Sequence, residues 1–235
     1  MGAHASDVAS ANWHASAALI ARYCREALLI DMGSTTTDVI PIVAGAVAAR
    51  GYTDAERLAT GELVYAGLVR SLVFASASRA PVAGVWTPLM NDDFANMADV
   101  HRIIGDLPTG ADVQATTDGR DKSLAASRAR LARMVGRDAH EMDDSAWLGL
   151  AQWFAERQVR DIADAAMQVL SGGRLAAEAP IVAAGIGGDV LRELIRRLGR
   201  RHLPFGDLID AAPPMREAAG RFAPAAAVAV LASSI

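Results

Sequence analysis

The stretch Asp31-Met32-Gly33-Ser34-Thr35-Thr36-Thr37-Asp38 decides the expected fold, because it follows a buried-type strand and leads directly into another. The preceding run, Ala27-Leu28-Leu29-Ile30, is short, continuous and apolar, which predicts a strand that is buried on both faces. Apolar residues then predict a second strand over residues 38–43 and a third over residues 47–49. Because these connections are too short for parallel crossovers, we expect an antiparallel meander.

The turn itself has the chemistry of a phosphate site. Its glycine permits close approach of backbone N–H groups to a ligand, and the hydroxyl residues that follow offer donors to phosphate oxygens. The predicted ligand-binding residues here are Gly33, Ser34, Thr35 and Thr36. Since Mg²⁺ prefers few carboxylates together with phosphate oxygens and water, we predict that Asp31 and Asp38 bind Mg²⁺ and act in catalysis. The alternative is a Ser/Thr-rich hairpin whose side chains bond their own backbone.

A second candidate site lies near the end of the chain. The run Pro180–Ala184 predicts a buried strand, and residues 189–198 predict a helix after a glycine turn. Free N–H groups at a helix start suit an anion, so we predict that Gly185, Gly187 and Gly188 bind a ligand. Their spacing is not the dinucleotide fingerprint. The alternative is that these glycines only let the helix pack tightly on the strand.

Composition excludes several classes of function. With 52 % hydrophobic and 21 % charged residues the chain is globular, and its net charge of −4 gives no basic surface for nucleic acid or anionic lipid. No apolar run has the length of a membrane span. A single cysteine fits a reducing compartment, so we expect a cytoplasmic protein without nucleic-acid or membrane partners. Further helices are predicted over residues 12–26, 121–135, 147–170 and 223–231.

Taken together, the two motifs resemble those of the ribonuclease-H-like second lobe of the actin, sugar-kinase and heat-shock-chaperone ATPase superfamily. Within it the chain resembles the hydantoinase/oxoprolinase-like branch, and in that branch the tetrahydromethanopterin-linked one-carbon transfer pathway proteins. These are relatives of the furan-methanamine synthases of methanofuran biosynthesis. The strings that carry the resemblance include residues 9–13, 29–41, 53–54, 57–58, 60–65, 98–99, 117–120, 127–138, 185–187 and 223–225.

This resemblance implies a transferase that condenses an aminomethyl-furan diphosphate with a tyramine-type phenol and releases pyrophosphate. Mg²⁺ and hydrogen-bond donors stabilise a departing diphosphate, and a base assists a phenol whose pKa is near ten. We predict Glu62 or Asp118 as the base and Arg70 or Arg120 as phosphate ligands; the alternative is that these charged residues pair to fix loops.

The string at residues 60–65 adds two predicted ligand-binding residues. These are Thr60 and Gly61.

The resemblance also sets the expected organisation. We expect residues 1–235 to form one α/β domain, the C-terminal lobe of a two-lobed protein, with a helical and loop insertion over about 51–175. Nothing like an N-terminal phosphate loop precedes Asp7, so we expect an enzyme only as part of a complete two-lobed assembly. The partner would be a second copy or a separately encoded lobe. The alternatives are an ATP-dependent hydantoinase/oxoprolinase- or kinase-like enzyme and a non-catalytic subunit.

Overall fold

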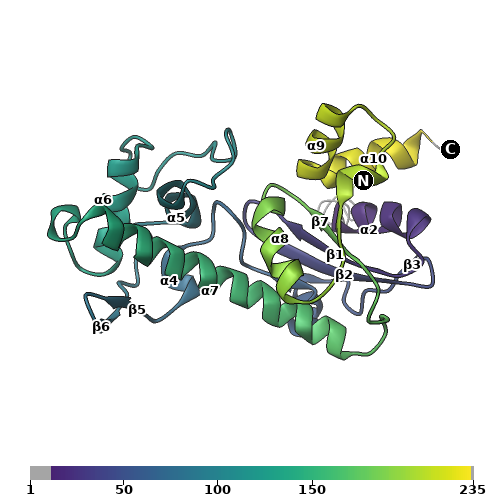
Figure 1. The fold of residues 1–235 in the computed structure, drawn as a ribbon, viewed down its shortest axis with the longest axis horizontal. Coiled ribbons are helices and arrows are strands. Elements are labelled where there is room, and N and C mark those ends of the chain that lie inside the picture. Colours follow the sequence, from purple (N-terminus) through teal and green to yellow (C-terminus); the bar gives the residue numbers. More distant parts are fainter. Residues whose placement is uncertain (1–11, 234–235) are drawn as a thin grey trace, which may run out of the picture. The chain divides into compact units, whose positions relative to one another are not determined.

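The computed structural model describes residues 12–233, which fall into two compact units (Figure 1). Unit 1 comprises residues 12–33, 37–64 and 162–233 of the described chain, and unit 2 comprises residues 34–36 and 65–161. Of the strings that carry the family resemblance, residues 9–11 lie outside the described part.

Unit 1 is built on a mixed sheet of six strands. The order is β3-β2-β1-β7-β8, and β4 pairs with β2 beside this path. Strands β1, β2 and β3 are antiparallel neighbours, which confirms the predicted meander. Strands β7 and β8 continue the sheet in parallel from β1. The bounds are β1 Ala27–Met32, β2 Thr37–Val43, β3 Ala46–Val47, β4 Leu63–Val64, β7 Ile181–Ala184 and β8 His202–Pro204.

Strand β1 is central, and all six of its residues are buried. The predicted burial on both faces is therefore confirmed, and strands β2 and β7 cover the two edges of β1. Alternate residues such as Leu29, Ile40 and Val182 face a core formed with α2 (Asn12–Tyr23), α9 (Pro213–Arg221) and α10 (Ala223–Ala232).

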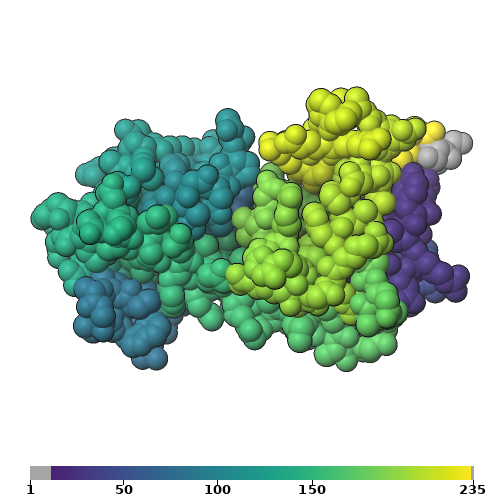
Figure 2. All heavy atoms as spheres, viewed as in Figure 1, coloured from purple at the N-terminus to yellow at the C-terminus, as the bar shows by residue number. Residues whose placement is uncertain are grey.

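Helix α8 (Gly188–Arg197) lies against β1, β7 and β8. Figure 1 shows α2 beside α10, and Figure 2 shows α9 and α10, in yellow, at the surface of unit 1. Two short elements complete the unit: α3 (Asp54–Thr60) and the 3₁₀ helix η2 (Phe205–Leu208).

Unit 2 is mainly helical and has a hydrophobic core of its own. A two-stranded antiparallel hairpin, β5–β6, packs with its helices around residues such as Met97, Leu131 and Phe154. Its elements are α4 Val73–Ser76, β5 Arg79–Val82, β6 Val85–Pro88, α5 Met97–Ile104, α6 Leu124–Met134 and η1 Ala139–Glu141. Helix α7 (Asp144–Ser171) contributes residues 144–161 to unit 2 and residues 162–171 to unit 1.

Among the described residues, no helix combines the length and apolar character needed to span a membrane.

Candidate functional site

Asp31 and Asp38 face each other at one end of the antiparallel pair β1–β2. They are register partners in this pair, and both lie on the sheet face that carries Leu29 and Ile40. The meander thus brings together two carboxyl groups that are seven positions apart in the sequence. Two carboxyl groups must be close together to bind one metal ion, as predicted for Asp31 and Asp38.

The Asp31 carboxyl group is buried, with 6 % of the residue exposed. Its side-chain oxygens receive no hydrogen bond from any residue that the structure describes. Burial, and to a smaller extent the negative charge of Asp38, raise the pKa of Asp31 to about 7. An unpaired buried carboxyl group is costly in the ionised form, so this position favours either a proton or a bound cation.

Asp38 differs from Asp31 because it has a cationic partner. Arg57 Nη2 lies 2.5 Å from Asp38 Oδ1 and also donates to the backbone oxygen of Glu62 at 3.1 Å. Burial raises the pKa of Asp38, and the charge of Arg57 opposes this rise. The guanidinium carbon lies 4.3 Å from the ring centroid of Trp13. The Nε atom of Arg57 is buried and has no acceptor among the described residues.

Arg57 is the site residue that the sequence analysis did not assign. Its string was matched to the family, but nothing local indicated its partner, which is 19 positions away in the sequence. The unpaired Nε–H is a donor for an acceptor oxygen, and the unpaired Asp31 carboxylate is a ligand for a cation.

The glycine turn between β7 and α8 lies directly against the end of β1. A Cβ atom at Gly185 would lie 2.3 Å from Met32 O and 2.5 Å from Asp31 Oδ1, and one at Gly187 would lie 2.3 Å from the Met32 sulfur. Packing alone therefore accounts for these two glycines. Gly188 is different, because an added Cβ atom there would meet nothing within 4 Å. The contact of Gly185 with Asp31 places the glycine turn next to this carboxyl group, as one ligand site made by both motifs would require.

Thr60 and Gly61 form the C-terminal end of helix α3, two residues before β4 begins. The Thr60 hydroxyl donates to the backbone oxygens of Glu56 and Arg57 at 3.0 and 3.2 Å. Gly61 adopts the left-handed conformation with φ 75°, a position that favours glycine. A Cβ atom there would lie 2.6 Å from Gln168 Oε1. Both residues thus have structural roles at a helix end.

Glu62 is fully buried, and its carboxylate accepts hydrogen bonds from the backbone. Arg50 N donates to both oxygens at 2.7 and 3.0 Å, and Gly51 N donates to Oε2 at 2.9 Å. Thr60 and Glu62 line a cavity of about 190 Å³ whose lining contains neither Asp31 nor Asp38. Backbone donors thus hold the Glu62 carboxylate, while the Glu62 backbone oxygen shares the Arg57 guanidinium with Asp38. The role of Glu62 as a base stays a prediction.

The backbone of the hydroxyl-rich turn is held by residues of unit 2. Ser34 O accepts hydrogen bonds from Val69 N at 3.1 Å and from Arg70 N at 2.7 Å. A Cβ atom at Gly67 would lie 2.4 Å from backbone atoms of Thr35, so only glycine fits there. The turn is therefore ordered by its carbonyl groups.

The side chains of the turn are half-buried, and their hydroxyls do not bond the turn's own backbone within the described residues. Ser34 Oγ and Thr35 Oγ1 lie 3.5 Å apart, and Thr36 is likewise half-buried. Arg70 is exposed, and its guanidinium has no partner in the described part of the chain. Contact of these residues with phosphate remains a prediction, as does that of Gly33.

No group of three or more histidine, cysteine, aspartate or glutamate side chains suited to a metal occurs in residues 12–233. The paired aspartates offer a two-carboxylate site, which suits Mg²⁺ only when phosphate oxygens and water complete its coordination. The donor set therefore fits a magnesium ion that arrives with a phosphorylated ligand.

The chain is similar to known proteins over most of its length. Residues 2–195 match the family model described as Hydantoinase/oxoprolinase. Two relatives bear the name (4-{4-[2-(gamma-L-glutamylamino)ethyl]phenoxymethyl}furan-2-yl)methanamine synthase. The chain is 30 % identical to that of Methanocaldococcus jannaschii over 190 residues, which are 80 % of this chain and 56 % of the relative. It is 28 % identical to that of Methanococcus vannielii over 175 residues, which are 74 % of this chain and 77 % of the relative. The match thus spans little more than half of the first relative.

Proposed function

The chain belongs to the hydantoinase/oxoprolinase family, and from this premise we propose that it is a transferase-like protein of methanofuran biosynthesis, a branch of one-carbon cofactor metabolism. Its reaction joins an aminomethyl-furan diphosphate to a tyramine-type phenol. The similarity of most of this chain to two synthases with the same name supports the assignment. That name describes a product in which a phenoxymethyl group is attached to a furan.

In the proposed reaction the phenol oxygen forms a bond to the methylene carbon that carries the diphosphate. The bond between this carbon and the diphosphate oxygen breaks, and pyrophosphate leaves with the bonding electron pair. The phenol proton passes to a base. The difficult part is the negative charge that develops on the departing diphosphate, and a site for this chemistry therefore needs cationic groups and hydrogen-bond donors.

The observation that carries the proposal is the Asp31–Asp38 pair beside the glycine turn. These two carboxylates would hold Mg²⁺, which when bound supplies positive charge to the diphosphate oxygens. Arg57 keeps Asp38 in place. Ser34, Thr35 and Thr36 follow in the chain as proposed phosphate ligands, together with Gly33, Arg70 and the turn residue Gly188.

We further propose that unit 1 corresponds to the ribonuclease-H-like second lobe of an actin-like protein. Its antiparallel meander β1–β3, continued in parallel by β7 and β8, supports this correspondence. In such proteins the ligand lies between two lobes, so a further lobe would complete the proposed site.

Ligand-dependent protection against thermal unfolding tests the function. We expect pyrophosphate with Mg²⁺ to raise the Tm, since a ligand at about 100 times its Kd stabilises a protein by about 2.7 kcal/mol. The effect should grow as the pH rises through about 7, because Mg²⁺ must displace the proton of Asp31. Asp31→Asn should abolish it, whereas Asp92→Asn, at an exposed loop position, should not.

Three outcomes would contradict the proposal. Stabilisation by ATP with Mg²⁺ but not by pyrophosphate would favour an ATP-dependent hydantoinase/oxoprolinase- or kinase-like enzyme instead. Undiminished pyrophosphate binding in the Asp31→Asn variant would remove Asp31 from the site. Absence of any response to either ligand would favour a non-catalytic subunit.

A further inference from the structure

Unit 2 contains a pocket whose lining does not include Asp31 or Asp38. Asp118 and Arg120, predicted from the sequence as a base and a phosphate ligand, both line it, and those two roles stay predictions. Its volume is about 340 Å³, and its lining is drawn from the segment before α5, the loop before α6, and α6 itself. A volume of this size is in the range of small-molecule sites. The lining includes three arginines, namely Arg120, Arg130 and Arg133. All lining residues belong to unit 2.

Two of these arginines have no carboxylate partner among the described residues. Arg120 is exposed, and only its backbone takes part in hydrogen bonds within its loop. Arg133 places its guanidinium carbon 4.6 Å from the ring centroid of Phe94. An arginine stacked on an aromatic face is held in one orientation while its N–H groups stay free for an acceptor.

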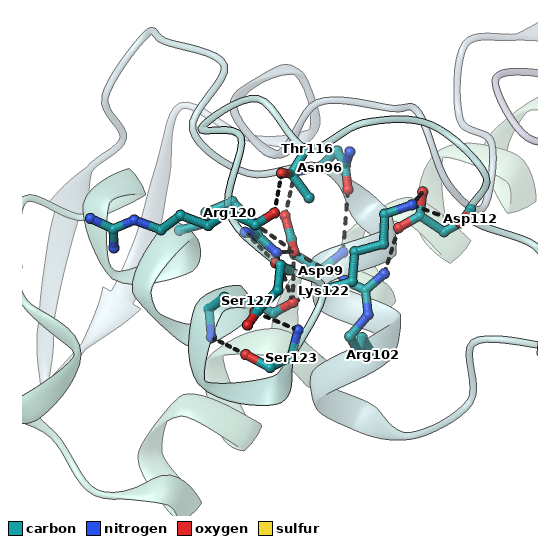
Figure 3. A network of polar contacts seen from close by, with 12 residues as sticks. Asn96, Asp99, Arg102, Asp112, Thr116, Arg120, Lys122, Ser123 and Ser127 are labelled. Atoms are coloured by element: carbon teal, nitrogen blue, oxygen red, sulfur yellow. Dashed lines mark hydrogen bonds and ion pairs between the residues drawn. The ribbon is translucent and has the colours of Figure 1, made fainter.

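The third arginine, Arg130, is buried and already paired. It donates to Asp99 Oδ1 through Nε at 3.0 Å and through Nη2 at 2.7 Å, and Nη1 lies 3.2 Å from Asp118 Oδ1. Asp99 also accepts from Ser127 Oγ at 2.7 Å and from Arg102 at 3.2 Å. Figure 3 shows this network around Asp99. The network is charge-balanced, and its role is to hold the pocket wall.

Asp118 connects this network to Arg120. Its Oδ1 atom accepts a hydrogen bond from Arg120 N at 3.1 Å. Burial would raise the pKa of Asp118, but this bond and the charge of Arg130 outweigh burial and lower it. Asp118 is therefore an ionised carboxylate that fixes the backbone of Arg120. Thr117 adds a further anchor, because its hydroxyl donates to Phe94 O at 3.1 Å.

The charges that remain unpaired in the pocket are two positive and one negative. Arg120 and Arg133 supply the positive charges, and Asp93, an exposed lining residue, supplies the negative one. We propose that this pocket binds a small organic oxyanion, a carboxylate or a phosphate monoester, through the guanidinium groups of Arg120 and Arg133. Guanidinium donors match such oxygens in pairs. Asp93 weakens binding by repelling the anion.

Calorimetric titration of the whole chain tests this proposal. EDTA is added to remove divalent metal ions, so that the proposed Mg²⁺-dependent site of unit 1 cannot bind the probes. The probes are phenyl phosphate, benzoate and benzamide, the last being a neutral match for benzoate. We expect benzoate or phenyl phosphate to bind and benzamide not to bind. The stronger of the two anions identifies the oxyanion class.

Variants then locate the site. Arg120→Gln and Arg133→Gln should each weaken the binding of the anion by about tenfold, the scale of one charge-assisted hydrogen bond. Asp93→Asn should strengthen it by about two- to fivefold, because it removes a like charge. Arg137→Gln is the matched control, since Arg137 lies outside the pocket and pairs with Glu141 at 3.1 Å. Asp31→Asn should also leave this binding unchanged, which separates the pocket from the proposed reaction.

The proposal is overturned if none of the probes binds at up to about 10 mM, a concentration that corresponds to very weak affinity. It is equally overturned if benzamide binds as well as benzoate. Equal losses in the Arg120, Arg133 and Arg137 variants would indicate a general charge effect and would exclude a defined site. Weaker binding in Asp93→Asn would contradict the assigned position of the anion.

Discussion

Asp31 has a carboxyl group that is buried in a sheet without a donor, and its pKa accordingly rises from 3.8 to about 7. Between these two values the folded protein keeps a proton that the unfolded chain has released. The contribution of Asp31 to stability is thus fully present below about pH 3.8 and is lost as the pH rises through about 7. The same ionisation turns Asp31 into a carboxylate that can bind a cation. Near neutral pH the folded protein therefore loses stability while Asp31 becomes able to bind a metal ion.

Replacing Asp31 by asparagine should remove this pH dependence in the absence of metal. Relative to the wild type, we expect Asp31→Asn to gain stability between pH 4 and pH 8, by an amount on the order of 3 to 4 kcal/mol. Urea unfolding at both pH values measures the gain. Asp210→Asn, at an exposed position, should show none. A difference between Asp31→Asn and the wild type that is the same at pH 4 and pH 8 would contradict the raised pKa.

Glu62 illustrates a buried carboxylate with the opposite arrangement, because backbone donors from Arg50 and Gly51 satisfy it. Glu62→Gln would place an amide NH₂ group where one carboxylate oxygen now accepts, leaving at least one buried backbone N–H without an acceptor. We expect a loss of about 2 to 3 kcal/mol in the free energy of unfolding. Chemical denaturation measures it, with the exposed Glu178→Gln as control. An unchanged stability would show that this carboxylate is not structural.

At the level of elements, the glycine turn before α8 contains one glycine that packing requires and another that packing does not require. Gly185 has φ 84°, and its Cβ atom would overlap Met32 O, so Gly185→Ala should destabilise unit 1 by at least about 2 kcal/mol. Gly188 has open space, and Gly188→Ala should be neutral or stabilise by up to about 1 kcal/mol. Thermal unfolding of the two variants measures this contrast.

The Gly188 variant then has a second readout. If the start of α8 approaches a phosphate group, the new methyl group should weaken pyrophosphate binding by about tenfold although the fold is intact. If a stable Gly188→Ala variant binds pyrophosphate as tightly as the wild type, the glycine turn serves packing alone.

The elements that the sequence predicted are those with a strong local pattern. The apolar run of β1, the glycine turn before α8 and the periodic helices α2, α6, α7 and α10 all formed near their expected positions. The strands β4 and β8 were not predicted, because these short segments become strands only by pairing with β2 and β7.

The candidate site divides in the same way. The meander predicted that Asp31 and Asp38 would be near each other, since both flank one short turn. The sequence did not indicate Arg57, whose partner Asp38 depends on how α3 packs against the sheet. It did not indicate the role of Glu62 either, because a carboxylate that accepts backbone hydrogen bonds looks in sequence like one that acts as a base.

At the level of the whole molecule, each unit of the described chain has a hydrophobic core cluster of its own. Phe205 is fully buried in the core of unit 1, and Phe154 is fully buried in the core of unit 2. No residue belongs to both clusters. Because a cavity weakens mainly the contacts that surround it, damage to one core should loosen its own unit first.

Alanine substitutions at these two phenylalanines test this independence. Each should cost about 3 to 5 kcal/mol in its own unit. In hydrogen exchange, Phe154→Ala should increase amide exchange mainly over residues 65–161, whereas Phe205→Ala should increase it in β1, β2 and β7. Equal increases in both units for either variant would show that the units unfold as one. If the units are independent, the anion pocket of unit 2 should still bind its probe in the Phe205→Ala variant, since no lining residue lies in unit 1.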